Sequence, residues 1–145
     1  MAEGLLQHKN DQQNLGLEID SAGTSNYHVG EAPDKRMQAK AAEYGIDISN
    51  QRGRQFTAAD FDAFDYIFPM DTSNYTNVMR LARNEDDRNK VKLFLDYIAP
   101  GEEMSVPDPY YGGDEGFEEV FQLLNKATDV FIESLNEWAH EVNYT

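Results

Sequence analysis

A carboxylate stands between two prolines in the segment Pro107-Asp108-Pro109, and two tyrosines, Tyr110 and Tyr111, follow directly. Proline fixes its own φ angle and drives the residue before it to extended backbone, so this segment would present Asp108 rigidly from a loop. A rigid acid suits proton donation to a leaving oxygen, and the tyrosines could wall a pocket for a flat aromatic group. Aspartate and proline are also ordinary turn residues, and their types alone favour a plain turn.

Two other polar groups stand where predicted strands end. Ser21 lies in the run Leu-Glu-Ile-Asp-Ser-Ala-Gly-Thr at 17–24, and Asp71 follows the apolar run at 65–70. Ligands of α/β proteins bind at the carboxyl ends of parallel strands, so Ser21 could support an anion-binding loop. The ordinary alternatives are a strand exit without a ligand for Ser21 and a helix cap for Asp71. Tyr27, on the loop after Ser21, could gate a pocket or pack on the body of the protein.

Length and charge limit the class of protein. The 145 residues are enough for a single domain over 1–145 with a sizeable core. Lys and Arg number 12 against 27 Asp and Glu, and the formal charge of −15 argues against nucleic acid or an anionic membrane as a partner. No apolar run approaches the ~20 residues of a spanning helix, and the start does not resemble a signal peptide. We therefore expect a soluble, cytoplasmic protein.

The chain contains no cysteine, which excludes disulfides, thiolate metal sites and thiol catalysis by its own residues. The three histidines, at positions 8, 28 and 140, are far apart in sequence and show no ligand spacing, so we expect no zinc site. The acidic group at 114–119 suits the positive end of a following helix better than calcium, because EF-hand spacing is absent.

Periodicity predicts the elements that must position these groups. Alternation of apolar and polar residues, or a short apolar run, predicts strands at 15–20, 65–70 and 91–98. Capping residues, helix formers and helical apolar spacing predict helices at 2–9, 34–44, 57–64, 71–83 and 117–138, with a polar loop at 84–90. Strands alternating with helices imply an α/β protein with three layers, α/β/α, around a parallel sheet. Three strands make a thin sheet for so many helices.

An ordered set of short segments resembles the low-molecular-weight protein tyrosine phosphatase family from Met1 to Phe131. The segments are Met1-Ala-Glu-Gly-Leu, Asp20-Ser-Ala-Gly-Thr, His28-Val-Gly, Pro33-Asp34, Gly45-Ile-Asp-Ile-Ser49, Arg54-Gln55, Phe64-Asp-Tyr-Ile, Met70-Asp71 and Asp108-Pro-Tyr-Tyr-Gly112. The last is similar to the general-acid loop of that family, so the resemblance replaces the plain turn as the interpretation of Asp108.

The resemblance implies a mechanism without metal or organic cofactor. A loop of the pattern Cys-x5-Arg supplies a thiolate nucleophile and binds the phosphoryl oxygens. Asp108 would be the general acid, while Tyr110, Tyr111 and Tyr27 would flank the phenyl ring of phosphotyrosine. Ser21 and Asp71 would support the phosphate loop. Expected partners are phosphotyrosine proteins, with a bacterial tyrosine kinase among them.

This sequence departs from the family in lacking that loop and the first strand before it, which would lie at the centre of the sheet between the segments at Leu15 and Tyr66. Gln51 stands near where many members have a histidine. One interpretation is that the protein carries roughly 15 further residues, one strand and a loop, and is then an active phosphatase. The other is an inactive homologue that acts as a binding or regulatory module, or a nonfunctional fragment. The chain as given is predicted to be inactive. The related arsenate reductases also need cysteines, and the tyrosine pair suits phosphotyrosine better than phosphoarginine.

Overall fold

The computed structural model describes residues 1–23, 30–107 and 113–143, with side chains at all of these positions except 113–114 and 136–143. The helices in chain order are α1 (Ala2–Gln13), α2 (Lys35–Glu43), α3 (Asp60–Ala63), α4 (Thr72–Leu81), α5 (Glu85–Asn89), the 3-10 helix η1 (Phe94–Tyr97) and α6 (Gly113–Asn143).

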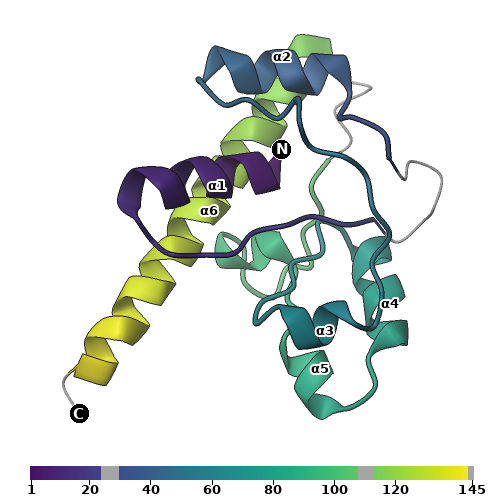
Figure 1. The fold of residues 1–145 in the computed structure, drawn as a ribbon, viewed down its shortest axis with the longest axis vertical. Coiled ribbons are helices and arrows are strands. Elements are labelled where there is room, and N and C mark those ends of the chain that lie inside the picture. The colour runs from purple at the N-terminus through teal and green to yellow at the C-terminus, as the bar shows by residue number, and fades with distance from the viewer. Residues whose placement is uncertain (24–29, 108–112, 144–145) are drawn as a thin grey trace.

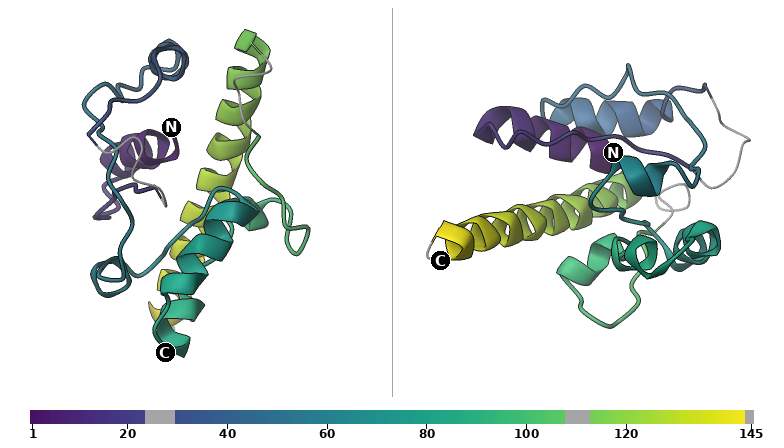
Figure 2. Two further views of the ribbon diagram at one scale, coloured as in Figure 1. Left: turned by 90° about the vertical axis from the view of Figure 1, so that its right-hand side faces the viewer. Right: turned by 60° about the horizontal axis from the view of Figure 1, so that its bottom comes forward.

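The long helix α6 organises the packing. Its apolar stripe is buried from Phe117 to Ile132, as the helical spacing predicts, and α1, α2 and η1 all pack against the helix. Figures 1 and 2 show α1 and α2 together on one side of α6, with α4 and α5 grouped away from them. The buried residues around α6 form the larger core cluster: Leu5, Ala41, Ile46, Ile48, Phe94, Leu95, Val120, Phe121, Leu124 and Ala127. A smaller cluster under α3 and α4 contains Phe56, Phe61, Ile67, Val78 and Val91.

The predicted parallel sheet is reduced to two isolated parallel bridges in the described part of the chain. Gly23 pairs with Gln55, and Ile67 pairs with Val91. The second pairing is held by the Ile67 N–H, which donates to the Lys90 carbonyl at 2.9 Å, and by the Lys92 N–H, which donates to the Ile67 carbonyl at 3.1 Å. Among the residues described, no bridge joins one pair to the other.

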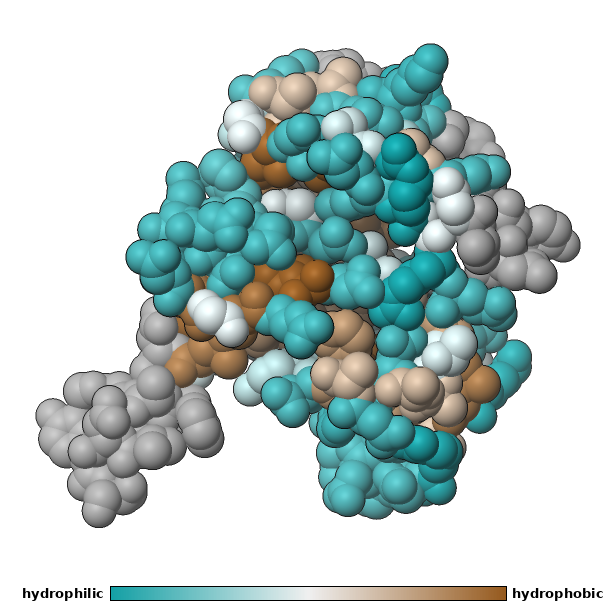
Figure 3. Space-filling view, viewed as in Figure 1, coloured by the Kyte–Doolittle hydropathy of each residue, from teal (hydrophilic) through white to brown (hydrophobic). Residues whose placement is uncertain are grey.

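The segment at 15–20 follows its predicted alternation without forming a strand. Leu15, Leu17 and Ile19 are half-buried, while the residues between them are exposed. The backbone of Leu17 instead forms hydrogen bonds with the side chain of Asn10. The Leu17 N–H donates to Asn10 Oδ1 at 2.9 Å, and the Leu17 carbonyl accepts from Asn10 Nδ2 at 3.3 Å. The segment crosses the middle of the view in Figure 1, where Figure 3 shows a band of apolar residues at the surface.

Two of the predicted elements are wrong in part. The third predicted strand, at 91–98, ends early. The Phe94 N–H donates to the Pro69 carbonyl at 3.0 Å, and the chain then turns into η1. The predicted loop at 84–90 contains α5. Asn84 caps this helix by accepting from the Asp87 N–H, and three acidic residues in its first turn suit the positive end of the helix dipole.

The boundaries of α1 and α3 also differ from prediction. Helix α1 continues to Gln13 and ends where Asn14 adopts a left-handed conformation. Helix α3 ends at Ala63, before Phe64, whose backbone is extended. One hydrogen bond of the predicted capping box between Thr57 and Asp60 is present, since Asp60 Oδ2 accepts from the Thr57 N–H at 2.9 Å.

Candidate functional site

Ser21 lies at the end of the extended segment and joins it to α1. Its hydroxyl donates to Glu3 Oε1 at 2.5 Å, and Glu3 belongs to the first turn of α1. Two residues later the Gly23 N–H donates to the Arg54 carbonyl at 2.8 Å, and the Phe56 N–H donates to the Gly23 carbonyl at 2.7 Å. Ser21 is therefore held between the start of α1 and the segment at 53–56. Sequence reasoning missed Glu3, because no spacing rule links two polar residues 18 positions apart.

Arg54 fixes that neighbouring segment. Its Nε lies 2.8 Å from Asp20 Oδ2, and its Nη2 lies 3.0 Å from Asp60 Oδ1. The hydrogen bond to Asp60 raises the pKa of Arg54, so the guanidinium stays charged. Gly53 forms backbone hydrogen bonds with the residues that follow positions 24–29. Its carbonyl accepts from the Gly30 N–H at 2.7 Å, and the Gly53 N–H donates to the Glu31 carbonyl at 2.8 Å.

The segment at 53–56 thus bonds to described residues on both sides of positions 24–29. Tyr27, predicted to flank the substrate ring, is one of these positions and lies outside the described residues.

Asp71 caps α4, which confirms the ordinary interpretation of this residue. Its Oδ1 accepts from the Asn74 N–H at 2.7 Å, and its carbonyl accepts from the Tyr75 N–H at 3.0 Å. The hydrogen bonds described for Asp71 stay within α4, and the hydroxyl of Ser21 bonds to α1. Different elements therefore position these two predicted supports. Figure 1 shows α4 beginning on the same side of the molecule as the end of the extended segment.

The residues just before the predicted acid loop are tied to those beside Asp71. The Val106 N–H donates to the Met70 carbonyl at 2.8 Å, and the Thr72 N–H donates to Ser105 Oγ at 3.1 Å. Helix α6 then begins at Gly113. The structure therefore places Ser105 and Val106 beside the first turn of α4. The loop residues themselves, Asp108, Tyr110 and Tyr111, lie outside the described residues.

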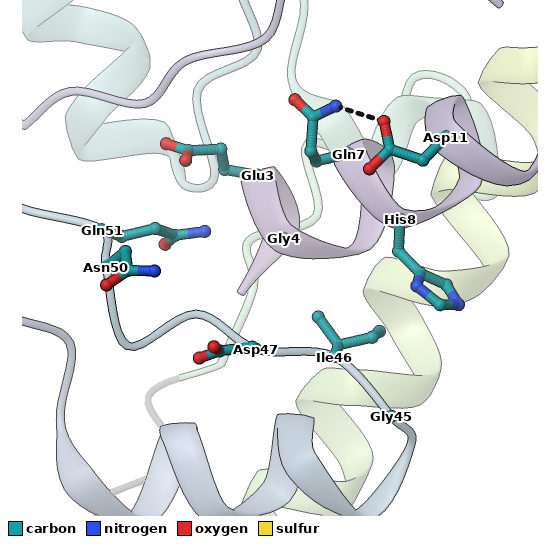
Figure 4. Close-up of a pocket in the computed structure, with 10 residues that line it drawn as sticks. All are labelled: Glu3, Gly4, Gln7, His8, Asp11, Gly45, Ile46, Asp47, Asn50 and Gln51. Carbon is teal, nitrogen blue, oxygen red and sulfur yellow. Dashed lines mark hydrogen bonds between the residues drawn. The ribbon is translucent and has the colours of Figure 1, made fainter. Parts of the chain in front are cut away.

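A pocket of about 330 Å³ opens beside Glu3, between α1 and the loop at 45–51 (Figure 4). It is lined by Glu3, Gly4, Gln7, His8, Asp11, Gly45, Ile46, Asp47, Asn50 and Gln51. Within the described ranges, no group of three or more His, Asp or Glu side chains is arranged to hold a metal ion. None of the predicted site residues is among those that line this pocket, although Glu3, which accepts the hydrogen bond from Ser21, is one of them.

The packing of α1 against this loop is close at Gly4. A Cβ placed on Gly4 would lie 2.4 Å from Ile48 Cγ2, so only glycine allows the observed approach. The position of Glu3, and with it the hydrogen bond to Ser21, depends on this contact.

Comparison with known proteins identifies the class to which this fold and these anchored loops belong. The profile of the low molecular weight phosphotyrosine protein phosphatase family matches residues 1–141. A putative low molecular weight protein-tyrosine-phosphatase from Synechocystis is 42% identical over 138 residues, which cover 94% of this chain and 87% of that protein.

Solved structures agree with the sequence comparison. A protein tyrosine phosphatase from Entamoeba histolytica superposes with a TM-score of 0.86 at 33% identity, covering 95% of this chain and 88% of the other. An arginine phosphatase from Drosophila gives a TM-score of 0.83 at 32% identity, with 92% and 87% covered. The chain belongs to the low molecular weight phosphotyrosine protein phosphatase family and is similar to structures with its α/β fold.

A search of the described helices for a membrane-spanning segment found none of sufficient length and apolar character.

Proposed function

We propose that this chain is a single domain that provides the general acid and the substrate-ring contacts of a protein tyrosine phosphatase site. Asp108 is the acid, Tyr110, Tyr111 and Tyr27 contact the phenyl ring, and Ser21 and Asp71 support the phosphate loop. The observation that carries the proposal is family membership across residues 1–141. The anchoring of Val106 to Met70, and of Gly23 and Gly30 to the segment at 53–56, supports it because these bonds hold described residues at the ends of both loops.

In the proposed reaction a thiolate attacks phosphorus, the Sγ–P bond forms and the bond to the tyrosyl oxygen breaks. Asp108 donates its proton to that leaving oxygen. A water molecule then attacks the phosphorus of the cysteinyl phosphate while Asp108 takes a proton from that water. The Sγ–P bond breaks, phosphate leaves and the thiolate is regenerated. The 145 residues contain no cysteine, so the nucleophile and the arginine of the phosphate loop must come from outside this sequence. The chain alone is inactive.

The backbone hydrogen bonds of Ile67 support the proposal of a further strand. In a parallel sheet the backbone N–H and C=O of one residue point toward the strand on one side. The N–H and C=O of the residues before and after it point toward the strand on the other side. Since Ile67 bonds toward Lys90 and Lys92, the backbone groups of Tyr66 and Phe68 face away from that pair. We propose that one further parallel strand lies between these residues and the segment at 15–20, with the phosphate loop at its carboxyl end.

The alternative is an inactive family member that binds phosphotyrosine proteins. The absence of cysteine favours it. Titration of a phosphotyrosine peptide into the 145-residue chain tests this alternative, and a lack of saturable binding would exclude it.

The substrate class follows from the tyrosines of the acid loop. Aromatic side chains favour contact with a flat ring, which phosphotyrosine has and phosphoarginine lacks. We therefore propose phosphotyrosine proteins in the cytoplasm as substrates, including a bacterial tyrosine kinase, although an arginine phosphatase is among the similar structures. The ratio of kcat/KM for phosphotyrosine and phosphoarginine peptides measures this preference.

The experiment that tests the function compares two proteins with an aryl phosphate substrate. The 145-residue chain should not hydrolyse it. The same chain preceded by an apolar strand and a Cys-x5-Arg loop should do so, and Asp108→Asn should then lower kcat about 10²- to 10⁴-fold. Glu102→Gln, which removes an exposed carboxylate six positions earlier, is the matched control and should leave kcat unchanged. Hydrolysis by the unextended chain that Asp108→Asn abolishes would contradict the proposal, as would an extended, folded chain without activity.

A further inference from the structure

Tyr44 ends α2 at an exposed contact with α6. Its ring stacks on Phe121, with centroids 3.7 Å apart and an angle of 13° between the planes. Its hydroxyl donates to Glu118 Oε1 and accepts from Gln122 Nε2 at 3.2 Å. The residue is still 40% exposed, so one edge of the ring faces solvent.

The charges around this hydroxyl are unbalanced. Lys40 is buried, and its Nζ lies 2.9 Å from Glu43 Oε2 and 3.3 Å from Glu118 Oε2. The hydrogen bond to Glu118 raises the pKa of Tyr44, so the phenol keeps the proton that it donates. Among the described residues, the groups linked to this hydroxyl are therefore the carboxylates of Glu43 and Glu118 and the ammonium group of Lys40, while the guanidinium of Arg36 lies farther along α2, 5.1 Å from the Phe117 ring centroid.

We propose that Tyr44 is a site of tyrosine phosphorylation and that the modification loosens α2 from α6. A tyrosine kinase would transfer the γ-phosphoryl group of a nucleoside triphosphate to Oη. The Oη–P bond forms, the bond from phosphorus to the bridging oxygen breaks, the nucleoside diphosphate leaves and the phenolic proton passes to solvent. The proposal does not depend on the phosphatase chemistry of the chain.

Two effects of the phosphate act against the observed contact. The oxygen loses its proton and can no longer donate to Glu118. The phosphate also adds about −1.5 to −2 charges next to Glu118 and Glu43, which one ammonium group cannot neutralise. Lys40 can reach the phosphate only by weakening its ion pair with Glu118. Both effects separate the last turn of α2 from α6.

The chain can change direction directly after Tyr44. Gly45 follows with φ of +77°, a left-handed backbone conformation that glycine adopts without strain. The loop at 45–51, which packs on Gly4, comes next. Release of Tyr44 would therefore also loosen the side of the molecule that holds Glu3.

Tyr66 is a matched control among the described tyrosines. It is more exposed, at 52%, and its neighbours are the rings of Phe68 and Phe131, at 6.0 and 5.3 Å between centroids. No carboxylate hydrogen bond is described for its hydroxyl. A phosphate on Tyr66 can point to solvent without breaking an ionic contact.

The structural effect is measured on full chains that carry phosphotyrosine at one position, introduced during translation. Phosphotyrosine at 44 should lower Tm by at least about 2–4 °C, whereas phosphotyrosine at 66 should shift it less. Glu118→Gln removes the repelling carboxylate and should reduce the shift caused by phosphate at 44. An unchanged Tm with phosphate at 44 would overturn the proposal, as would equal shifts for 44 and 66.

Access to the site is tested separately. The folded chain is incubated with a broad-specificity tyrosine kinase, ATP and Mg²⁺, and the phosphorylated residues are located by peptide mass mapping. Phosphate should appear on Tyr44 and be absent from that peptide in the Tyr44→Phe variant. Modification of other tyrosines without Tyr44 would overturn the proposal.

Discussion

The side of the molecule built on α6 and the side built from α3, α4 and α5 are stabilised by different interactions. Around α6 the buried residues are mainly apolar and come from α1, α2, the loop at 45–51, η1 and α6, while the ion pairs of Lys9 with Asp129 and of Lys40 with Glu118 lie beside them. On the other side a smaller apolar cluster is supplemented by ion pairs of Arg54 and Arg83 with four aspartates, which are Asp20, Asp60, Asp62 and Asp87. Apolar burial is insensitive to pH, whereas an ion pair is lost when its carboxylate is protonated. The two sides should therefore respond differently to the same perturbation.

Phe121→Ala should have the largest effect, because it removes the ring at the junction of α2 and α6. Phe121 is 4% exposed and stacks on Tyr44. Truncation of a buried phenylalanine costs about 3–5 kcal/mol. Urea unfolding measures the loss, with Lys126→Ala on the exposed face of α6 as a control that should change stability by less than about 0.5 kcal/mol. A loss below about 1 kcal/mol would mean that α6 does not organise the core.

Gly4→Ala should destabilise the same side by about 1–3 kcal/mol, the usual range for an overpacked core. The new Cβ would meet Ile48 Cγ2 at 2.4 Å. A double-mutant cycle with Ile48→Ala checks the cause, because removing Cγ2 should reduce the cost of the substitution at Gly4. Equal costs in both backgrounds would show that the close contact is not responsible.

Acid should weaken the α3–α5 side. Arg83 Nε lies 2.9 Å from Asp87 Oδ2, and Arg83 Nη2 lies 2.7 Å from Asp62 Oδ1. These hydrogen bonds lower the pKa of both carboxyls in the folded protein. Each therefore contributes stability that is fully present above the unfolded pKa of about 4 and is lost as the pH falls through the folded pKa. Urea unfolding between pH 6 and 3 should show this loss, and Asp87→Asn should make the decline shallower. A decline of equal slope in the variant would contradict this assignment.

Ser21→Ala should have the smallest effect, a loss of less than about 1 kcal/mol in the free energy of unfolding. It removes one exposed hydrogen bond, from the Ser21 hydroxyl to Glu3, and leaves the backbone bonds of Gly23 in place. Thermal unfolding checks it. A loss comparable to that of Phe121→Ala would show that the start of α1 depends on Ser21 rather than on Gly4.

Local patterns predicted the elements whose structure is set by neighbouring residues. The apolar stripe of α6, the Asp71 cap of α4 and the alternation of Leu15, Leu17 and Ile19 all appear in the structure. Each depends on spacing or capping within a short segment, which the sequence displays directly.

Features that depend on distant partners were not predictable in the same way. The segment at 15–20 has strand periodicity, but a strand also needs a neighbouring chain to supply its hydrogen bonds, and Asn10 takes part of that role. The contact of Glu3 with Ser21 and the approach of Gly4 to Ile48 join residues that no spacing rule connects. The roles of Asp108, Tyr110, Tyr111 and Tyr27 remain predictions from the family resemblance.

The most direct test of the central claim is the intact mass of the protein isolated from its natural source, before and after treatment with a thiol-alkylating reagent. The account predicts a mass above that of the 145-residue chain by roughly 15 residues, the size of one strand and a loop, together with uptake of the reagent by at least one cysteine. A mass equal to that of the 145 residues, with no uptake, would contradict the proposed phosphatase and leave the binding alternative.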